Sequence, residues 1–271
     1  MRTNINAYIY ILELDIKDMV VVTILILLVF MSSINSLKMS SLSPLSIPIP
    51  SSIKLILWDV DGTLSDSFQL GFSSTKVVLN NNGIKDITEE EYHLGTKYTT
   101  PRRLAWHVTG NPDDPIGISL GNQFDELYVK LVSTKTAGLY PGVVDMLDKI
   151  LDKNKNIKYG ALSNAAGAYV RAVCDVNNLN SKFIVKYGAD DVPEAKPSPL
   201  GLINICKELQ CSVDETIYIG DSPSDGMAAS SCGMYSVGVT YGSHPISTVK
   251  PNFSATVTTV SELQSLLLSM V

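Results

Sequence analysis

From residue 53 onward, short apolar segments alternate along the chain with longer amphipathic segments. The apolar segments predict strands at residues 53–58, 157–162, 183–186, 216–219 and 235–239. The amphipathic segments predict helices at residues 142–154, 167–178, 198–210, 223–232 and 260–270. Strands that are apolar on both faces and alternate with helices are typical of a parallel sheet covered on both sides. The pattern therefore predicts an α/β fold with a doubly wound, Rossmann-like parallel sheet.

Residues 70–136 interrupt this alternation. They carry no convincing strand, and their periodicity predicts helices at residues 70–82, 88–94, 100–109 and 118–133. The block is too long for a simple crossover between the first two strands of the sheet. We therefore expect a separate helical subdomain at residues 70–136, inserted after the first strand into a core formed by residues 53–69 and 137–271.

The first 52 residues belong to neither part. Residues 19–31 are almost continuously apolar, but this run is shorter than the about 20 residues that span a bilayer. It resembles the apolar region of a signal peptide, and a short membrane anchor is the alternative. Residues 32–54 are rich in serine and proline and contain no acidic residue, which is typical of a linker or a transit segment. We assign residues 1–52 to a targeting segment and linker, and expect membrane contact only through residues 19–37.

Composition restricts the partners and the compartment. The net charge of −6 gives no basic surface for nucleic acid. The four cysteines form no CxxC pair and lie in apolar helical patterns, so we interpret them as buried free thiols in a reducing compartment. Cytoplasm and an organelle such as a plastid both remain open. The three histidines lack a ligand pattern and are interpreted as surface or structural residues.

Two carboxylates stand at the end of the strand at residues 53–58. Asp59 and Asp61 are two positions apart, so both can point into one cleft near the end of that strand. Two acids this close repel each other, and one tends to keep a proton. The pair can therefore supply one nucleophile or metal ligand and one acid/base. A solvated turn also favours Asp and Gly. The pair alone therefore does not distinguish a catalytic site from a turn, and the other motifs of the chain are needed.

Three further polar motifs follow at strand ends or helix starts. Ser163-Asn164 and Asp221-Ser-Pro-Ser-Asp225 each come directly after a predicted strand, and Lys196 stands at the start of a predicted helix. Because functional groups in parallel sheets gather at the carboxyl ends of the strands, we expect these groups to meet Asp59 there. Carboxylates, a hydroxyl and an ammonium suit a metal-bound phosphate, and an all-oxygen ligand set suits Mg²⁺.

These motifs, in this order, resemble the haloacid-dehalogenase-like superfamily of phosphotransferases over about residues 53–270. The helical insert looks like a type 1 cap of that superfamily. Within it, the segment 59–64 with Asp66-Ser67 close behind is similar to phosphoglycolate phosphatases. So is the ending formed by Ala228-Ala229, Gly233 and the segment 238–242.

The resemblance implies three catalytic residues. Asp59 would be the nucleophile that forms an aspartyl-phosphate. Asp61 would protonate the leaving alkoxide and then activate the water that hydrolyses this intermediate. Lys196 would neutralise charge between the phosphoryl group and Asp59. Such a division suits phosphoryl transfer, which depends on positioning and charge neutralisation.

The resemblance also implies binding residues. Phosphoryl oxygens would be held by Thr63, Ser163 and Asn164. Magnesium would be bound by Asp59, Asp61 (through its backbone carbonyl), Asp221 and Asp225. The serine and asparagine could also be a plain helix N-cap, and Asp221 could cap the helix that follows it.

The helical insert is expected to select a small phosphorylated metabolite, with 2-phosphoglycolate as the first candidate. Its carboxylate needs a cation or a helix N-terminus facing the core, and Arg102 and Arg103 are the candidates. Adjacent helical residues point about 100° apart, so at most one of them is expected to reach the cleft. A sugar-phosphate phosphatase, a nucleotidase, a β-phosphoglucomutase-like mutase and a non-catalytic phosphate-binding module remain alternatives.

Overall fold

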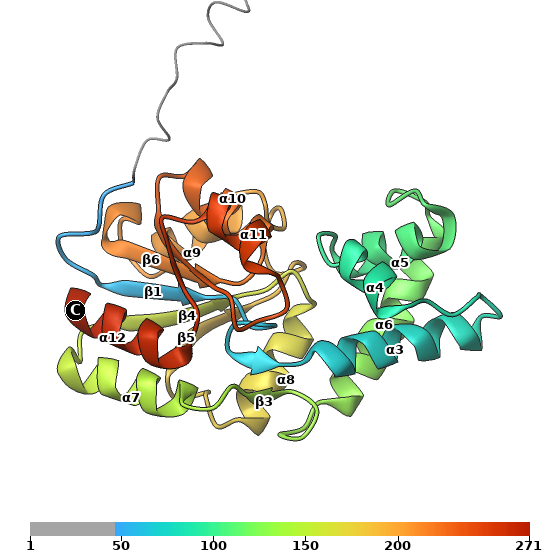
Figure 1. Ribbon diagram of the computed structural model, residues 1–271, viewed down its shortest axis with the longest axis horizontal. Coiled ribbons are helices and arrows are strands. Elements are labelled where there is room, and N and C mark those ends of the chain that lie inside the picture. Colours follow the sequence, from blue (N-terminus) through green and yellow to red (C-terminus); the bar gives the residue numbers. More distant parts are fainter. Residues whose placement is uncertain (1–46) are drawn as a thin grey trace, which may run out of the picture. The chain divides into compact units, whose positions relative to one another are not determined.

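Six parallel strands form the central sheet of the computed structural model, which describes residues 47–271 (Figure 1). In spatial order they are β5 (Phe183–Tyr187), β4 (Lys158–Leu162), β1 (Leu55–Trp58), β6 (Thr216–Gly220), β7 (Tyr235–Val239) and β8 (Ala255–Val257). The chain proceeds outward from β1 in both directions, so the predicted doubly wound α/β fold is confirmed. The edge strand β8 was not predicted because it has only three residues.

Helices cover both faces of this sheet (Figure 1). One face packs against α7 (Val143–Lys153), α8 (Gly167–Val176) and α12 (Val260–Met270). The other packs against α9 (Leu200–Glu208) and α10 (Pro223–Ser231). These five helices match the five predicted for the core. Three short turns of helix complete it: η1 (Val213–Glu215), α11 (Ile246–Val249) and η2 (Lys250–Asn252).

Strand β1 shows why the sheet is buried on both faces. Ile56 and Trp58 join the apolar cluster on the side of α7, α8 and α12, whereas Leu55 and Leu57 join the cluster on the side of α9 and α10. All four side chains have no exposed surface. Burying each contributes roughly 1.5–3 kcal/mol, so β1 fixes the position of the residues that follow it.

A helical cap is inserted between β2 (Ser65–Asp66) and β3 (Gly138–Leu139), which pair antiparallel. Its helices are α3 (Phe68–Asn81), α4 (Glu89–Gly95), α5 (Thr100–Thr109) and α6 (Ile116–Leu131). They gather beside the sheet-bearing core in Figure 1. The four predicted helices and their insertion after the first strand are confirmed. The pair β2–β3 was not predicted, because two-residue strands leave no periodicity to read.

The expected targeting segment and the possible anchor at residues 19–37 lie outside the described residues. Within residues 47–271, none of the helices combines the length and the apolar character needed to cross a bilayer. The cysteines of this part are free thiols as predicted; Cys174, Cys206 and Cys211 are buried and Cys232 is partly buried.

Candidate active site

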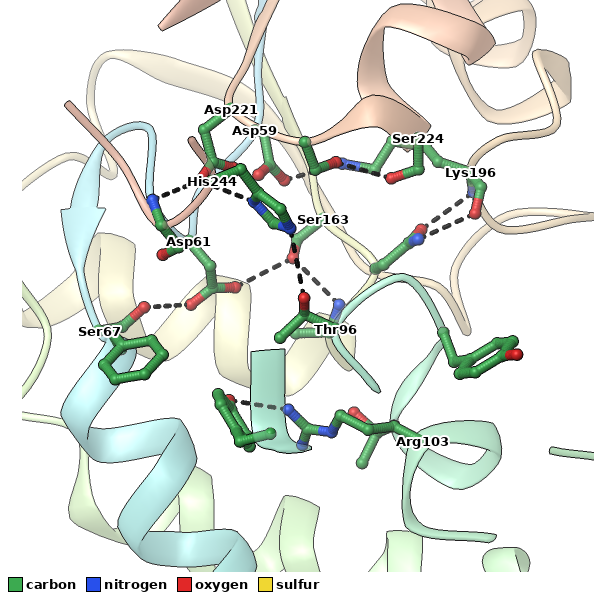
Figure 2. A pocket seen from close by; sticks show the side chains of 18 of the residues that line it. Asp59, Asp61, Ser67, Thr96, Arg103, Ser163, Lys196, Asp221, Ser224 and His244 are labelled. Atoms are coloured by element: carbon green, nitrogen blue, oxygen red, sulfur yellow. Dashed lines mark hydrogen bonds and ion pairs between the residues drawn. The ribbon is translucent and has the colours of Figure 1, made fainter. Parts of the chain in front are cut away.

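Three neighbouring strands end in polar side chains at one edge of the sheet. Asp59 follows β1, Ser163 follows β4 and Asp221 follows β6, and these strands lie in the order β4–β1–β6. Lys196 joins them from the loop between β5 and α9, and Asp225 from the first turn of α10. Figure 2 shows these elements converging on one pocket. The sequence motifs are therefore brought together as expected at the carboxyl ends of the strands.

A tight turn after β1 brings the backbone against Asp221. Gly62 has φ +74°, a conformation that favours glycine. A Cβ atom at this position would lie 2.1 Å from Oδ2 of Asp221. The same oxygen accepts a hydrogen bond from the backbone N–H of Ser243 at 2.7 Å. Glycine is required here both by the backbone conformation and by the space that Asp221 occupies.

Asp59, Asp221 and Asp225 form a compact carboxylate cluster. One oxygen from each lies within 4.8 Å of the others, and all three side chains are buried. Three buried carboxylates and one ammonium leave excess negative charge, and all the donors are oxygens. This donor set fits a hard divalent cation such as Mg²⁺. The carboxylate of Asp61 is not in this cluster, in keeping with a metal contact that was expected only through its backbone carbonyl.

Lys196 lies within the cluster. Its Nζ atom is 2.8 Å from Oδ1 of Asp59 and 2.6 Å from Oδ1 of Asp225. It also contacts the Leu162 carbonyl at 3.0 Å and the Tyr218 hydroxyl at 2.8 Å. Burial acts to lower the pKa of this lysine, but Asp225 and Asp59 outweigh it, so the pKa is raised overall. Lys196 therefore keeps its positive charge beside Asp59.

Asp59 is held in an environment that disfavours its charge. Burial raises its pKa well above the usual range, and the carboxylates of Asp225, Asp221 and Asp61 act in the same direction. The Lys196 ammonium acts against this rise in pKa. A cation bound to the cluster would add to the effect of Lys196 and favour the ionised, nucleophilic form of Asp59.

Asp61 faces the pocket from the turn between β1 and β2. Its Oδ2 atom accepts a hydrogen bond from the Ser163 hydroxyl at 3.2 Å. Its Oδ1 atom accepts one from the Ser67 hydroxyl at 2.5 Å. Figure 2 shows Asp61 between these two serines. Two tyrosines, Tyr128 and Tyr169, also reach Oδ1. Both occupy apolar helical positions that look like core, so their contacts with Asp61 are not predictable from the sequence.

Two of the expected phosphoryl-binding residues do not present a free side-chain group to the pocket. The side-chain amide of Asn164 donates to the backbone carbonyl of Lys196 and accepts from its backbone N–H, both at 2.9 Å. Asn164 lines the pocket, but its side chain holds Lys196 in place. Thr63 is fully buried outside the pocket lining, and its hydroxyl has no hydrogen-bond partner within residues 47–271. The structure thus does not bring the Thr63 side chain to the site.

The cap closes the pocket from the opposite side, leaving a cavity of about 110 Å³. Arg103 on α5 lines this cavity and is only 7% exposed. Its Nη1 donates to the Tyr92 hydroxyl at 2.8 Å, and its guanidinium lies 4.6 Å from the centre of the Phe124 ring. Its Nε has no hydrogen-bond partner among the described residues. Arg103 is therefore a buried cation at the pocket wall whose donors are not all used.

Arg102 points elsewhere, as the 100° rotation between adjacent helical residues requires. Its guanidinium pairs with Asp113 at 2.9 Å, with both side chains more than half exposed. It does not line the pocket. Of the two arginines considered as substrate contacts, the structure brings only Arg103 to the site.

His244 bridges the core and the cap. Its Nδ1 lies 3.3 Å from Oδ2 of Asp221, and its Nε2 lies 3.2 Å from the hydroxyl of Thr96 in the cap (Figure 2). The sequence predicts a surface or structural role for His244, whereas the structure places it in the pocket lining. Its place in the pocket lining could not be read from spacing, because its two partners are 23 and 148 positions away.

The fold and the site together define a family. A model of the family described as haloacid dehalogenase-like hydrolase matches residues 56–239. The chain therefore belongs to the haloacid dehalogenase-like hydrolases, and the resemblance stated from the sequence motifs is confirmed.

Within this family the chain is similar to phosphatases. It is 29% identical over 212 residues to the phosphoglycolate phosphatase of Vibrio vulnificus strain YJ016, covering 75% of this chain and 92% of that one. It is 28% identical to the phosphoglycolate phosphatase of Shigella boydii, covering 70% and 82%. The expectation of an enzyme of the phosphatase type, similar to phosphoglycolate phosphatases, is confirmed.

Solved structures agree on the fold. A haloacid dehalogenase-like hydrolase from Bacteroides fragilis gives a TM-score of 0.70 at 23% identity, covering 78% of this chain and all of that one. CbbY from Rhodobacter sphaeroides, solved in complex with phosphate, gives a TM-score of 0.67 at 21% identity, covering 78% and 96%.

Proposed function

We propose that the protein is a Mg²⁺-dependent phosphomonoester hydrolase that forms an aspartyl-phosphate on Asp59. Its substrate is a small phosphorylated metabolite, with 2-phosphoglycolate as the first candidate. The observation that carries this proposal is the buried cluster of Asp59, Asp221 and Asp225 with the Lys196 ammonium 2.8 Å from Asp59. Asp59 is a carboxylate nucleophile held in this way, and a second carboxylate, Asp61, lies beside it. Together they provide the groups that a two-step hydrolysis requires.

The two steps use the two carboxylates in turn. In the first step an oxygen of Asp59 forms a bond to phosphorus as the bond to the ester oxygen breaks, and the protonated Asp61 gives its proton to the leaving alkoxide. In the second step Asp61 takes a proton from water, whose oxygen bonds to phosphorus as the bond from phosphorus to the Asp59 oxygen breaks, and inorganic phosphate is released. Asp59 is then restored as a carboxylate and Asp61 as an acid, so one residue serves as acid and then as base.

Charge neutralisation is the second requirement of phosphoryl transfer. Lys196 contacts Asp59 directly and keeps its charge in the buried cluster. Mg²⁺, held by Asp59, Asp221 and Asp225, would neutralise negative charge on the phosphoryl oxygens. Ser163, whose hydroxyl lies 3.2 Å from Oδ2 of Asp61, lines the same pocket and can donate to a phosphoryl oxygen.

The choice of substrate rests on the cap. The cavity is small and is lined by both core and cap, which favours a small metabolite. Arg103 offers a buried cation with an unused donor to a second anionic group. A phosphate ester with a carboxylate meets both conditions, and the phosphatases of Vibrio vulnificus and Shigella boydii are named for such an ester.

The test is phosphate release by the full-length protein from a panel of esters with and without Mg²⁺. The panel contains 2-phosphoglycolate, hexose phosphates, nucleotides and pyrophosphate, and the control is Asp59→Asn. We expect Mg²⁺-dependent release that chelation abolishes and that is absent in the control, with the highest kcat/KM for 2-phosphoglycolate.

Three results would count against the proposal or against its substrate. Release that persists in Asp59→Asn would exclude Asp59 as the nucleophile. Binding of phosphate by a folded protein without turnover of any ester would favour the non-catalytic phosphate-binding module. A higher kcat/KM for a hexose phosphate or a nucleotide would keep the mechanism but reject the carboxylate-bearing substrate.

A further inference from the structure

The carboxylate of Asp61 is contacted by more hydroxyl groups than the proposed chemistry explains. The hydroxyls of Ser67 and Tyr169 each lie 2.5 Å from its Oδ1, and that of Tyr128 lies 3.1 Å from the same atom. Among the described residues, Oδ2 has a single such contact, with Ser163 at 3.2 Å. A carboxylate oxygen offers about two lone-pair positions. The three donors therefore fill the lone-pair positions of Oδ1. Oδ2, which Ser163 contacts, keeps a position for a further group.

The two tyrosines come from opposite sides of the site. Tyr128 is on α6 of the cap and Tyr169 is on α8 of the core. Their rings stack with centroids 4.0 Å apart and planes 16° apart, and both side chains are buried. Burial, together with the negative charge of Asp61, raises the pKa of both phenols well above the usual range. Both hydroxyls therefore keep their protons and act as donors to the carboxylate.

We propose that Tyr169 and Tyr128 are positioning residues that hold Oδ1 of Asp61, so that Oδ2 is the oxygen that exchanges the proton with the leaving group and with water. This inference rests on the proposed function. Tyr169 does not line the pocket, so it acts through Asp61 and not on the substrate. Because Tyr128 belongs to the cap, the acid/base is held from both sides of the pocket.

The leaving group of the substrate separates such a role from a general loss of structure. An alkoxide needs a proton as the P–O bond breaks, whereas acetate is a weak base and leaves without one. Ethyl phosphate and acetyl phosphate are both small enough for comparison in the same cavity. Misplacement of Asp61 should therefore lower kcat/KM for ethyl phosphate much more than for acetyl phosphate.

The variants are Tyr169→Phe and Tyr128→Phe, and the matched control is Tyr159→Phe. Tyr159 is also fully buried, but its hydroxyl donates to the Leu147 carbonyl at 3.0 Å, away from the site. We expect Tyr169→Phe to lower kcat/KM for ethyl phosphate about tenfold, part of the 10²–10⁴-fold that a general acid contributes. Tyr128→Phe should act in the same direction, with less effect because its contact is longer. Tyr159→Phe should not lower kcat/KM for one ester more than for the other.

A second measurement removes Asp61 itself. If the tyrosines act through Asp61, adding Tyr169→Phe to Asp61→Asn should cost no further activity on ethyl phosphate, because the group that they position is gone. Independent structural damage would instead multiply the two losses. Tyr128→Phe repeats the test should Tyr169→Phe fold poorly.

The inference is overturned if the tyrosine variants lower kcat/KM equally for both esters, change neither, or raise it for ethyl phosphate. It is also overturned if the losses in the double variant multiply. The Asp59→Asn control keeps these results apart from the proposed function. If that control retains phosphate release, the proposed function itself fails; if it is inactive, a negative result with the tyrosines concerns the positioning role alone.

Discussion

The ammonium of Lys196 and the carboxylate of Asp59 lie 2.8 Å apart in the interior although 137 positions separate them in the chain. Asp59 is fixed by the end of β1, whereas Lys196 comes from a loop. Asn164, directly after β4, makes two hydrogen bonds to the backbone of Lys196 and ties this loop to the edge of the sheet. The site thus depends on the sheet for the position of Asp59 and on Asn164 for the position of the Lys196 ammonium.

Replacing the buried lysine should destabilise the protein. Lys196→Met leaves the carboxylates of Asp59 and Asp225 buried without their cation, which should lower the free energy of unfolding by about 3 kcal/mol. Urea unfolding in Mg²⁺-free buffer measures this change. Lys54→Met is the control, since it removes a pair with Glu215 on the surface and should change stability little. Equal losses in the two variants would contradict the role given to Lys196.

Two glycines with left-handed backbone separate conformational strain from steric conflict. Gly62→Ala places a Cβ 2.1 Å from Oδ2 of Asp221, whereas Gly83→Ala, at φ +68°, meets nothing within 4 Å. Gly83→Ala should cost only the about 1–2 kcal/mol of the backbone conformation. Gly62→Ala should cost more and should also reduce Mg²⁺-dependent activity, because Asp221 must move. Thermal unfolding and phosphate release test this, and similar effects of the two variants would exclude the close approach.

Arg103 and Arg102 form a matched pair of adjacent cations. Arg103→Gln should raise KM for 2-phosphoglycolate at least about tenfold, because a hydrogen bond to a charged group contributes about 1.5–3 kcal/mol. KM for ethyl phosphate, which has no carboxylate, should change little. Arg102→Gln should leave both values near those of the native protein. A rise in KM for both esters with Arg103→Gln would show that Arg103 does not recognise the carboxylate.

Asp125 on α6 should make stability depend on pH. Burial raises the pKa of its carboxyl to about 6 in the folded protein, against a usual 3.8. The folded state therefore holds this proton more tightly than the unfolded state. The stability that this gives is complete below about pH 4 and is lost as the pH rises through 6.

Asp125→Asn removes this loss, since asparagine carries no charge at any pH. From about pH 4 to about pH 7, the free energy of unfolding of the variant should rise by about 1–2 kcal/mol relative to that of the native protein. This figure is reduced for the partial exposure of the side chain. Urea unfolding at the two pH values measures the difference. If the two proteins show the same change in stability with pH, the buried carboxyl does not titrate as described.

Local sequence was sufficient to predict the sheet and the polar residues at the ends of its strands. Asp59, Ser163 and Asp221 directly follow apolar strands, and parallel strands bring their carboxyl ends to one edge whatever the details of packing. The strand β8 was missed because three residues at a sheet edge carry too little pattern. The phase of α5 decides that Arg103 and not Arg102 faces the pocket, and a sequence gives that phase only when the buried face is known.

Contacts between the cap and the core could not be predicted from the sequence. Tyr128 and Tyr169 occupy buried helical positions, and a tyrosine there is compatible with a plain core. Whether its hydroxyl meets a carboxylate depends on how α6 and α8 pack against the turn after β1. The same is true of His244, whose partners Asp221 and Thr96 come from different parts of the chain.

The most direct test of the mechanism is to look for the phosphoryl group on Asp59. Full-length protein is mixed with Mg²⁺ and 2-phosphoglycolate and quenched in acid, and the peptide that contains Asp59 is analysed by mass spectrometry. With acetyl phosphate, whose acetate leaves without a proton, Asp61→Asn should accumulate the phosphorylated peptide, because the water that cleaves the intermediate lacks its base; Asp59→Asn should show none. We expect one phosphoryl group on Asp59. Steady phosphate release with no phosphoryl group on that peptide, in the native protein and in Asp61→Asn alike, would contradict the aspartyl-phosphate mechanism.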